Sequence, residues 1–203
     1  MKIYSPLFIT IRVIVYSLLI YGMAEGIFFD AVHPMEEGFF GEITFTEISQ
    51  EVILFILFLF YLIVGFKYKP VQPVANIVSL FFLASFIREF NFLIEHWIYP
   101  VLLVLGIMIW LAARDFKKLK EATITFFSQP ASAWFFAGFL VTYIFSRLLG
   151  RSKFWQLLYD ENSYRIAKAA SEESVELLGD TIMLISIVEF SLFLWVEKKG
   201  NSK

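Results

Sequence analysis

The sequence contains no cysteine and only two histidines in 203 residues, and just 18% of its residues are charged. Without cysteine there is no disulfide, iron–sulfur cluster, haem thiolate or cysteine nucleophile. Two distant histidines exclude His-rich zinc sites and the paired-His helical motif of zinc proteases. A typical globular chain has about 25% charged residues. The composition therefore excludes a disordered chain, a nucleic-acid-binding module and a water-soluble enzyme.

Apolar and aromatic residues dominate instead. Hydrophobic residues make up 59% of the chain and aromatic residues 19%, including 25 phenylalanines. A membrane-spanning helix needs roughly 20 mainly apolar residues, and six stretches meet or approach that length. We therefore predict an all-α integral membrane protein, a single polytopic domain over 1–203 built as a bundle of about six transmembrane helices. The predicted spans are 6–29, 43–66, 74–92, 97–113, 132–149 and 174–196.

Basic residues are divided unequally between the two sets of segments that connect these spans. The side that includes both termini carries ten basic and three acidic residues. The other side, with the outer ends of the spans included, carries six basic and fifteen acidic residues. An excess of Lys and Arg marks the cytoplasmic side of a membrane protein. We therefore predict a multi-pass protein of the plasma membrane, in particular a bacterial inner membrane, with both termini in the cytoplasm.

Ionisable residues within the spans gather near the predicted outer surface. Glu47 and Glu51 are four residues apart, and Glu172, Glu176 and Asp180 repeat that spacing, so each set forms a stripe on one helix face. Charged stripes at membrane depth are expected to turn away from lipid. The pattern predicts an acidic pocket that opens outward, with Glu51 and Asp180 as its deepest residues.

The chemistry of these side chains suggests three kinds of site. Clustered carboxyl groups suit proton transfer, arginine suits phosphate, and carboxylate oxygens suit Ca²⁺, Mg²⁺ or Mn²⁺. The predicted catalytic residues are Glu176, Glu51 and Asp180. The predicted substrate-binding residues are Arg88, Arg147 and Asn91. The predicted ligands of a divalent cation are Glu47, Glu51, Glu172, Glu173, Glu176 and His96.

A structural explanation competes with each of these roles. Acidic residues in the first turn of a helix stabilise the helix dipole, and Thr44 with Glu47 fits a capping box. Arg88 and Glu89 suit an ion pair that fixes one helix to a neighbour. His96, flanked by aromatic residues, also suits the aromatic belt at a membrane surface.

Residues 151–170 combine apolar, aromatic and basic side chains before the last predicted span. This composition predicts an amphipathic helix at the membrane interface, acting either as a lid over the pocket or as a connector. Within the last span, Gly179 lies beside Asp180, and a residue without a side chain allows close approach of a neighbouring helix.

Three functions fit these features. The first is a hydrolase or transferase that acts on a lipid or lipid-linked substrate, with carboxylates and a divalent cation activating the nucleophile and arginine holding the headgroup. The second is a non-catalytic membrane subunit whose polar cluster joins helices or docks a protein partner. The third is a small cation- or proton-linked transporter. Two features count against transport: no helix looks broken by proline or glycine at mid-membrane, and the cytoplasmic half of the spans lacks a polar lining.

Overall fold

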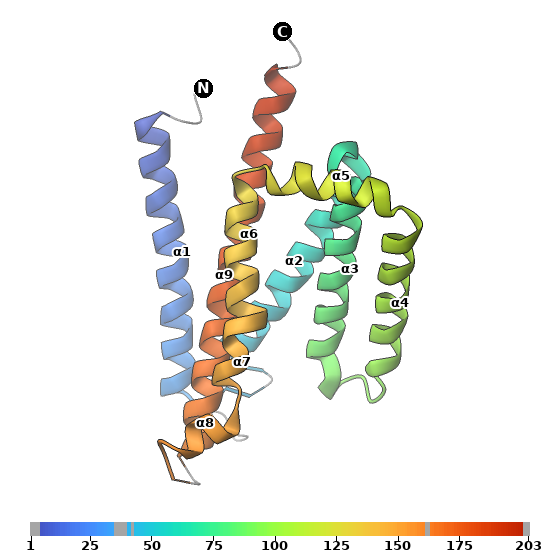
Figure 1. Cartoon of the computed structure of the whole chain (residues 1–203). Coiled ribbons are helices and arrows are strands. Elements are labelled where there is room, and N and C mark those ends of the chain that lie inside the picture. The colour runs from blue at the N-terminus through green and yellow to red at the C-terminus, as the bar shows by residue number, and fades with distance from the viewer. Residues whose placement is uncertain (1–4, 35–39, 42, 161–162, 201–203) are drawn as a thin grey trace. The chain divides into compact units, whose positions relative to one another are not determined.

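We describe the protein from a computed structural model that places residues 5–34, 40–41, 43–160 and 163–200. Those ranges contain helices and no strand. The terminal charges Lys2 and Lys203, which contribute to the predicted orientation, lie outside them. The elements in chain order are α1 (Pro6–Val32), α2 (Phe45–Lys67), η1 (Lys69–Val71), α3 (Gln72–Glu89), η2 (Phe90–Phe92), α4 (Ile98–Arg114), α5 (Phe116–Phe127), α6 (Ala131–Phe139), η3 (Leu140–Phe145), α7 (Ser146–Leu149), α8 (Ser152–Gln156) and α9 (Tyr164–Gly200) (Figure 1).

Within the described ranges, five helical segments are long and apolar enough to cross a membrane, and they correspond to five of the six predicted spans. These segments are Pro6–Val32, Phe45–Lys67, Lys69–Phe92, Ala131–Leu149 and Tyr164–Val196. The predicted fourth span corresponds to α4, which has only 17 residues and is followed by α5 after a bend of 97°. The count is therefore five, or six if the bent pair is one span.

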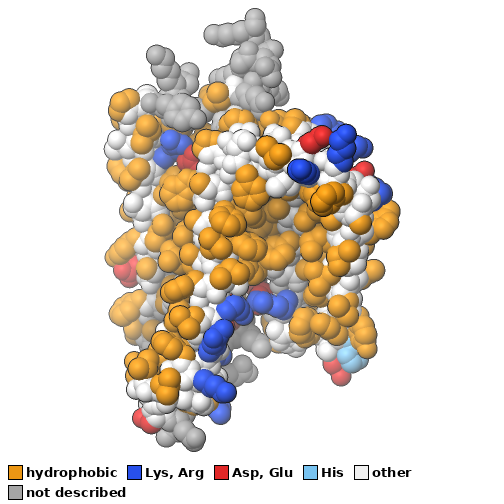
Figure 2. All heavy atoms as spheres, viewed as in Figure 1, with side chains coloured by type: hydrophobic (Ala, Val, Ile, Leu, Met, Phe, Trp, Pro, Cys, Tyr) orange, Lys and Arg blue, Asp and Glu red, His pale blue; other side chains and the backbone are white. Residues whose placement is uncertain are grey.

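The chain forms two compact units, which we describe separately. The first contains Met1–Gln50 and Trp134–Lys203, and the second contains Glu51–Ala133. The division falls within α2 and again within α6. Hydrophobic side chains cover much of the visible surface of both units, with few charged side chains among them (Figure 2). Along α1, for example, Leu7 is 72% exposed and Leu18 is 64% exposed.

The second unit is organised around a buried aromatic cluster. The ring of Tyr61 on α2 stacks on Phe82 of α3, with centroids 6.1 Å apart, and meets Phe126 of α5 edge-on at 6.2 Å. All three side chains are almost fully buried. Ser79 donates a hydrogen bond to the carbonyl of Phe58 at 3.2 Å, which adds a polar contact between α3 and α2.

The first unit is built around α9, which packs against α1, η3, α7 and α8 (Figure 1). The two segments approach closely at Gly138 on α6 and Gly179 on α9. A Cβ atom on Gly179 would lie 2.7 Å from the backbone nitrogen of Thr142 and 2.9 Å from the carbonyl oxygen of Gly138. The expectation that Gly179 permits close helix packing is thus confirmed.

The beginning of α2 is fixed to the end of α1. Asp30 is buried in the last turn of α1 and accepts hydrogen bonds from the backbone N–H groups of Phe45 at 3.0 Å and Thr46 at 2.8 Å. The hydroxyl of Thr46 also donates to Asp30, at 2.6 Å. Thr44 accepts a longer hydrogen bond, 3.4 Å, from the N–H of Glu47, as half of the predicted capping box. Asp30 therefore caps a helix 15 residues further along the chain.

The segment expected to form an interfacial helix, 151–170, is divided differently in the structure. Its first part contains the five-residue helix α8, and its last residues belong to α9, which begins at Tyr164 and is continuous with the predicted last span. Residues 161–162 lie outside the described part. The side chains of Leu157 and Leu158, which follow α8, are strongly exposed.

Candidate functional site

The residue at which α9 begins determines whether its acidic residues lie in the first turn of the helix. The sequence places the start of the last span near residue 174, so that Glu172 and Glu173 would lie at the helix start. In the structure α9 begins at Tyr164, and these residues lie more than two turns inside the helix. They therefore cannot serve as first-turn partners of the helix dipole, and they interact with side chains instead.

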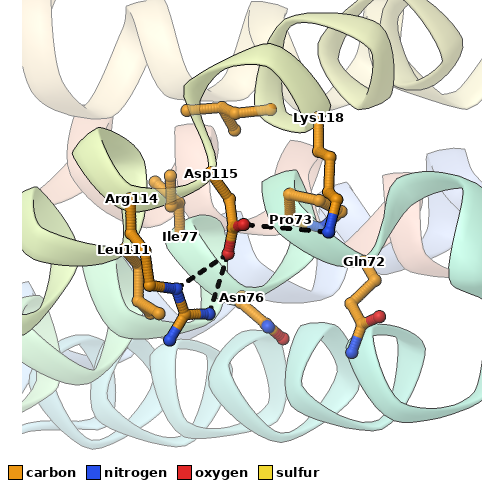
Figure 3. A pocket seen from close by; sticks show the side chains of 9 residues that line it. Gln72, Pro73, Asn76, Ile77, Leu111, Arg114, Asp115 and Lys118 are labelled. Atoms are coloured by element: carbon orange, nitrogen blue, oxygen red, sulfur yellow. Dashed lines mark hydrogen bonds and ion pairs between the residues drawn. The ribbon is translucent and has the colours of Figure 1, made fainter.

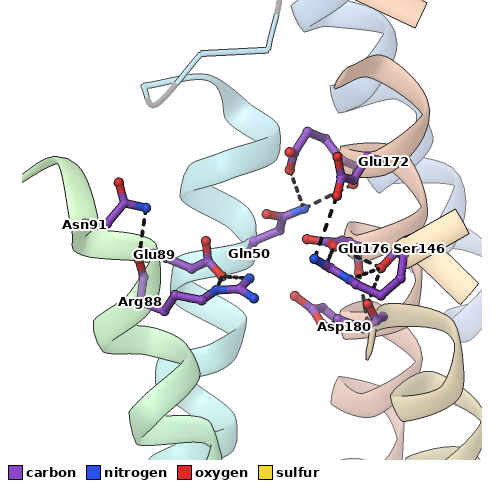
Figure 4. A network of polar contacts seen from close by, with 11 residues as sticks. Gln50, Arg88, Glu89, Asn91, Ser146, Glu172, Glu176 and Asp180 are labelled. Atoms are coloured by element: carbon purple, nitrogen blue, oxygen red, sulfur yellow. Dashed lines mark hydrogen bonds and ion pairs between the residues drawn. The ribbon is translucent and has the colours of Figure 1, made fainter. Parts of the chain in front are cut away.

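Glu176 is the centre of a polar network between α7 and α9 (Figure 4). Arg147 of α7 donates through Nη2 to Glu176 Oε1, and the Ser146 hydroxyl lies 2.9 Å from the same oxygen. Ser146 also lies within hydrogen-bond distance of the Thr142 carbonyl, so its single proton is shared between two acceptors. The side chain of Glu176 is only 10% exposed, whereas that of Arg147 is 46% exposed.

Asp180 lies one helical turn beyond Glu176 and is 2% exposed. The hydroxyl of Thr142 is 2.9 Å from Asp180 Oδ1 and 3.3 Å from the carbonyl oxygen of Glu176. Thr142 belongs to η3, which is a π-helical stretch. Because π-helical turns are wider than α-helical turns, they change which side chains share a face. Thr142 shares this face with Ser146, whereas the Tyr143 ring packs 5.1 Å from that of Phe139.

The network continues toward the start of α9. Lys168 Nζ lies 3.3 Å from Glu172 Oε2, and Arg147 Nη1 lies 3.8 Å from Glu172 Oε1. The amide of Gln50 on α2 donates to the carbonyl oxygen of Glu173 at 3.1 Å and to its carboxylate at 3.2 Å. These contacts bring Arg147 together with three of the predicted acidic residues, Glu172, Glu176 and Asp180, in one region of the first unit (Figure 4).

The remaining predicted residues have local roles in the structure. In the second unit, Arg88 Nη2 lies 2.5 Å from Glu89 Oε1, so the ion pair considered from the sequence forms (Figure 4). Both residues belong to α3, so this pair does not by itself fix α3 to a neighbouring helix. Asn91 donates to the carbonyl oxygen of Arg88 at 3.1 Å and stabilises the turn after α3. His96 is exposed, and its ring centroid lies 5.9 Å from that of Tyr99. Glu51, the other predicted deep carboxyl, is partly buried in the second unit.

The proposed cation ligands do not form a metal site in the structure. Among the described residues, no group of three or more histidine, aspartate or glutamate side chains is arranged to hold a metal ion. The geometry gives a reason: Glu172 and Glu176 are engaged by Lys168 and Arg147. The predicted set of Glu47, Glu51, Glu172, Glu173, Glu176 and His96 is therefore not supported as a cation site. The helical spacing in the sequence placed the acidic residues on one helix face, but it could not show which basic side chains would contact them.

A second polar cluster, between α1 and α9, was not recognised as a site from the sequence. Arg12 Nη1 lies 2.7 Å from Glu189 Oε2 and 2.9 Å from Oε1, and the Tyr16 hydroxyl donates to Oε1 at 2.5 Å. Both charged side chains are more than four-fifths buried. The sequence nevertheless indicates this pair, because Arg12 and Glu189 are opposite charges in two otherwise apolar spans and such charges are expected to pair.

The second unit also contains a polar cavity of about 230 Å³ near the junction of α4 and α5 (Figure 3). Arg114 donates through Nε and Nη2 to Asp115, at 2.9 and 2.8 Å, and Lys118 lies 3.8 Å from the same carboxylate. The hydrogen bond from Arg114 lowers the pKa of Asp115 below its usual value. Gln72 and Asn76 of α3 line the opposite wall.

These features define a class of protein without identifying a member of it. The helices of the described chain are compatible with a multi-pass membrane protein, and the first unit has buried ion-paired clusters on two sides of α9. No protein-family model, curated protein or solved structure matches the chain.

Proposed function

We propose that this chain is a non-catalytic, multi-pass membrane protein in which buried polar clusters join α9 to neighbouring helices. One observation carries the proposal: each deep carboxylate of α9 is engaged by side chains from another helix. Arg147 and Ser146 contact Glu176, and Thr142 contacts Asp180. On another face, Arg12 and Tyr16 contact Glu189. In a lipid environment, where hydrophobic burial drives helix association weakly, such contacts hold helices together.

The charge distribution supports the orientation that accompanies this proposal. We place both termini in the cytoplasm and the protein in the plasma membrane, because the basic excess lies on the connections that include the termini. In that orientation the Glu172–Asp180 cluster lies toward the outer surface. Exposed apolar residues next to basic ones around α8, such as Leu157 and Lys153, would then lie at the lipid interface.

The helix-joining role is tested by the stability of Glu176→Gln, with Glu25→Gln on an exposed position of α1 as the matched control. Losing the charged acceptor of Arg147 and Ser146 should lower the free energy of unfolding by about 1–3 kcal/mol. The control should change it by less than about 0.5 kcal/mol, as surface substitutions usually do. Unfolding in mixed SDS micelles measures both. Equal stabilities of the two variants would show that Glu176 does not join the helices.

A lipid-directed enzyme is a second candidate, and the exposure of Arg147 favours it. Its guanidinium reaches the buried Glu176 while 46% of its side chain stays exposed, so a lipid phosphate could bind the accessible part. Glu176 would then be the carboxyl next to the bound headgroup, and Asp180 would lie one helical turn further along α9. Mass spectrometry of phospholipids in proteoliposomes distinguishes this candidate. The enzyme hypothesis requires that the wild type converts a phospholipid and that Asp180→Asn and Arg147→Gln lose this turnover.

Transport is the third proposal, and it has its own readout. The π-helical stretch η3 interrupts regular α-helical hydrogen bonding beside Asp180, although its sequence contains neither proline nor glycine. Transport would require cation- or pH-dependent flux in liposomes that changes in Glu51→Gln or Asp180→Asn. Flux equal to that of protein-free liposomes would exclude it.

A further inference from the structure

The first unit contains a second cavity, of about 350 Å³, on the face of α9 that meets α1. Most of its wall is apolar and is formed by Ile9, Val13 and Ile20 of α1 together with Trp134 of α6. The polar part of its lining is Ser17 together with the ion-paired cluster of Arg12, Tyr16 and Glu189. Ligand sites commonly have such volumes and such a lining, mainly apolar with a few polar groups.

Glu189 uses only one corner of the Arg12 guanidinium. Both hydrogen bonds between the two side chains start at Arg12 Nη1. The edge formed by Nε and Nη2 is therefore not involved in the pair. Arg12 Nε is buried and has no hydrogen-bond partner among the described residues. A buried donor without an acceptor is unfavourable, so this atom indicates a missing partner.

Two other paired arginines of the described chain use this edge. Arg114 donates through Nε and Nη2 to Asp115, and Arg88 donates through the same two atoms to Glu89. In both cases a carboxylate oxygen takes up the side edge of the guanidinium. At Arg12 both hydrogen bonds to the carboxylate come from Nη1, and Nε has no acceptor among the described residues.

The charge of the cluster decides what kind of acceptor fits. Arg12 and Glu189 together are neutral, and the Tyr16 hydroxyl already donates to Glu189. An added anion would leave a net negative charge within an apolar wall, which is costly at membrane depth. A neutral carbonyl oxygen supplies the acceptor without that charge. The wall formed by Val13, Ile20 and Trp134 suits an apolar body attached to it.

We propose that this cavity binds an apolar molecule that presents a neutral carbonyl oxygen to the Nε–Nη2 edge of Arg12. Two sources offer this chemistry: the acyl ester of a bilayer lipid, and a freely diffusing lipid-soluble quinone or ketone. The site depends on the α1–α9 cluster alone and is independent of the role proposed for Glu176.

The test uses the full-length protein in detergent and three probes with the same twelve-carbon chain. The probes are methyl dodecanoate with a neutral ester, dodecanoate with a carboxylate, and dodecyl methyl ether without a carbonyl group. Binding is followed by tryptophan fluorescence, because Trp134 lines the cavity. The wild type should bind the ester at least tenfold more tightly than the other two. Equal affinity for all three, or tighter binding of the carboxylate, would overturn the proposal.

Two variants connect the binding to this cavity. Arg12→Lys keeps a positive charge for Glu189 but has no Nε–Nη2 edge, so it should lose the tenfold preference for the ester. Val13→Phe fills the cavity without touching the ion pair and should weaken binding of every probe. If Arg12→Lys fails to fold, Val13→Phe still decides the question. Wild-type affinity in a folded variant of either kind would contradict the assignment.

Two further measurements identify the source of the carbonyl group. Stability is compared in nanodiscs of a diester phospholipid and of its diether analogue, which has the same headgroup and chains but no carbonyl groups. A stabilisation by the diester that is absent in Arg12→Lys identifies a lipid ester. Displacement of methyl dodecanoate by decyl-benzoquinone, but not by decylbenzene, identifies a quinone-type ligand. Failure of both measurements would contradict the proposal.

Discussion

Replacing Gly179 by alanine tests the close packing on which the first unit depends. The added Cβ would lie 2.7 Å from the backbone nitrogen of Thr142 and 2.9 Å from the carbonyl oxygen of Gly138. Both are backbone atoms, so no rotamer change relieves the overlap and the helices themselves must separate. Separation would also lengthen the 2.9 Å hydrogen bond from Thr142 to Asp180.

The magnitude follows from three contributions. Overpacking a well-packed site costs about 1–3 kcal/mol. Weakening a hydrogen bond to a charged group costs up to about 1.5–3 kcal/mol. Alanine recovers about 1 kcal/mol through its higher helix propensity. We therefore expect Gly179→Ala to lower the free energy of unfolding by about 2–4 kcal/mol in mixed SDS micelles.

The matched control is Gly22→Ala on α1, where an added Cβ meets no atom within 4 Å. This variant gains helix propensity without a clash and should be as stable as the wild type or slightly more stable. If Gly179→Ala unfolds at the same SDS fraction as Gly22→Ala, the contact between α9 and the α6–η3 segment is not as close as described.

Three further predictions follow from individual contacts. Asp30→Ala removes three hydrogen bonds from the start of α2 and should destabilise the protein by about 1–2 kcal/mol in the same assay, whereas an unchanged midpoint would contradict the cap. Glu189→Gln leaves Arg12 without a charged partner and should cost up to about 3–5 kcal/mol, a loss that Glu25→Gln should not reproduce. The lowered pKa of Asp115 means that its stabilising contribution is present above pH of about 4 and is lost as pH falls below it. Asp115→Asn should therefore reduce the loss of stability in acid, and an identical pH profile would contradict this pairing.

Most of the helical organisation could be predicted from the sequence, because long apolar runs specify a spanning helix with little help from tertiary contacts. Five long helices lie where they were predicted. The predictions from sequence differed from the structure at two places, the start of α9 and the end of α4. Residues 164–173 are polar enough to resemble a connecting segment, yet they extend α9 because no helix-breaking residue separates them from the span. The bend after Arg114 follows a short α4, whose length a hydropathy pattern defines poorly.

The candidate site was predicted in part. Helical spacing placed Glu172, Glu176 and Asp180 on one face. In the structure Arg147 contacts Glu172 and Glu176, whereas Asp180 contacts Thr142. Spacing could not reveal that Thr142 would contact Asp180 from the facing helix, because the π-helical turn that sets this face has no sequence signature in Leu140–Phe145. The capping role of Asp30 was also missed, since it depends on how α1 and α2 approach each other.

The most direct test of the proposed helix-joining role is a double-mutant cycle on Arg147 and Glu176, with methionine replacing each residue singly and together. Methionine keeps much of the side-chain length and removes the charge, so the cycle isolates the interaction between the two. Because Arg147 is half exposed, we expect a favourable coupling energy of about 1–3 kcal/mol, below the largest values for fully buried pairs. Additive effects of the two substitutions, with a coupling energy near zero, would show that this pair does not hold α7 to α9.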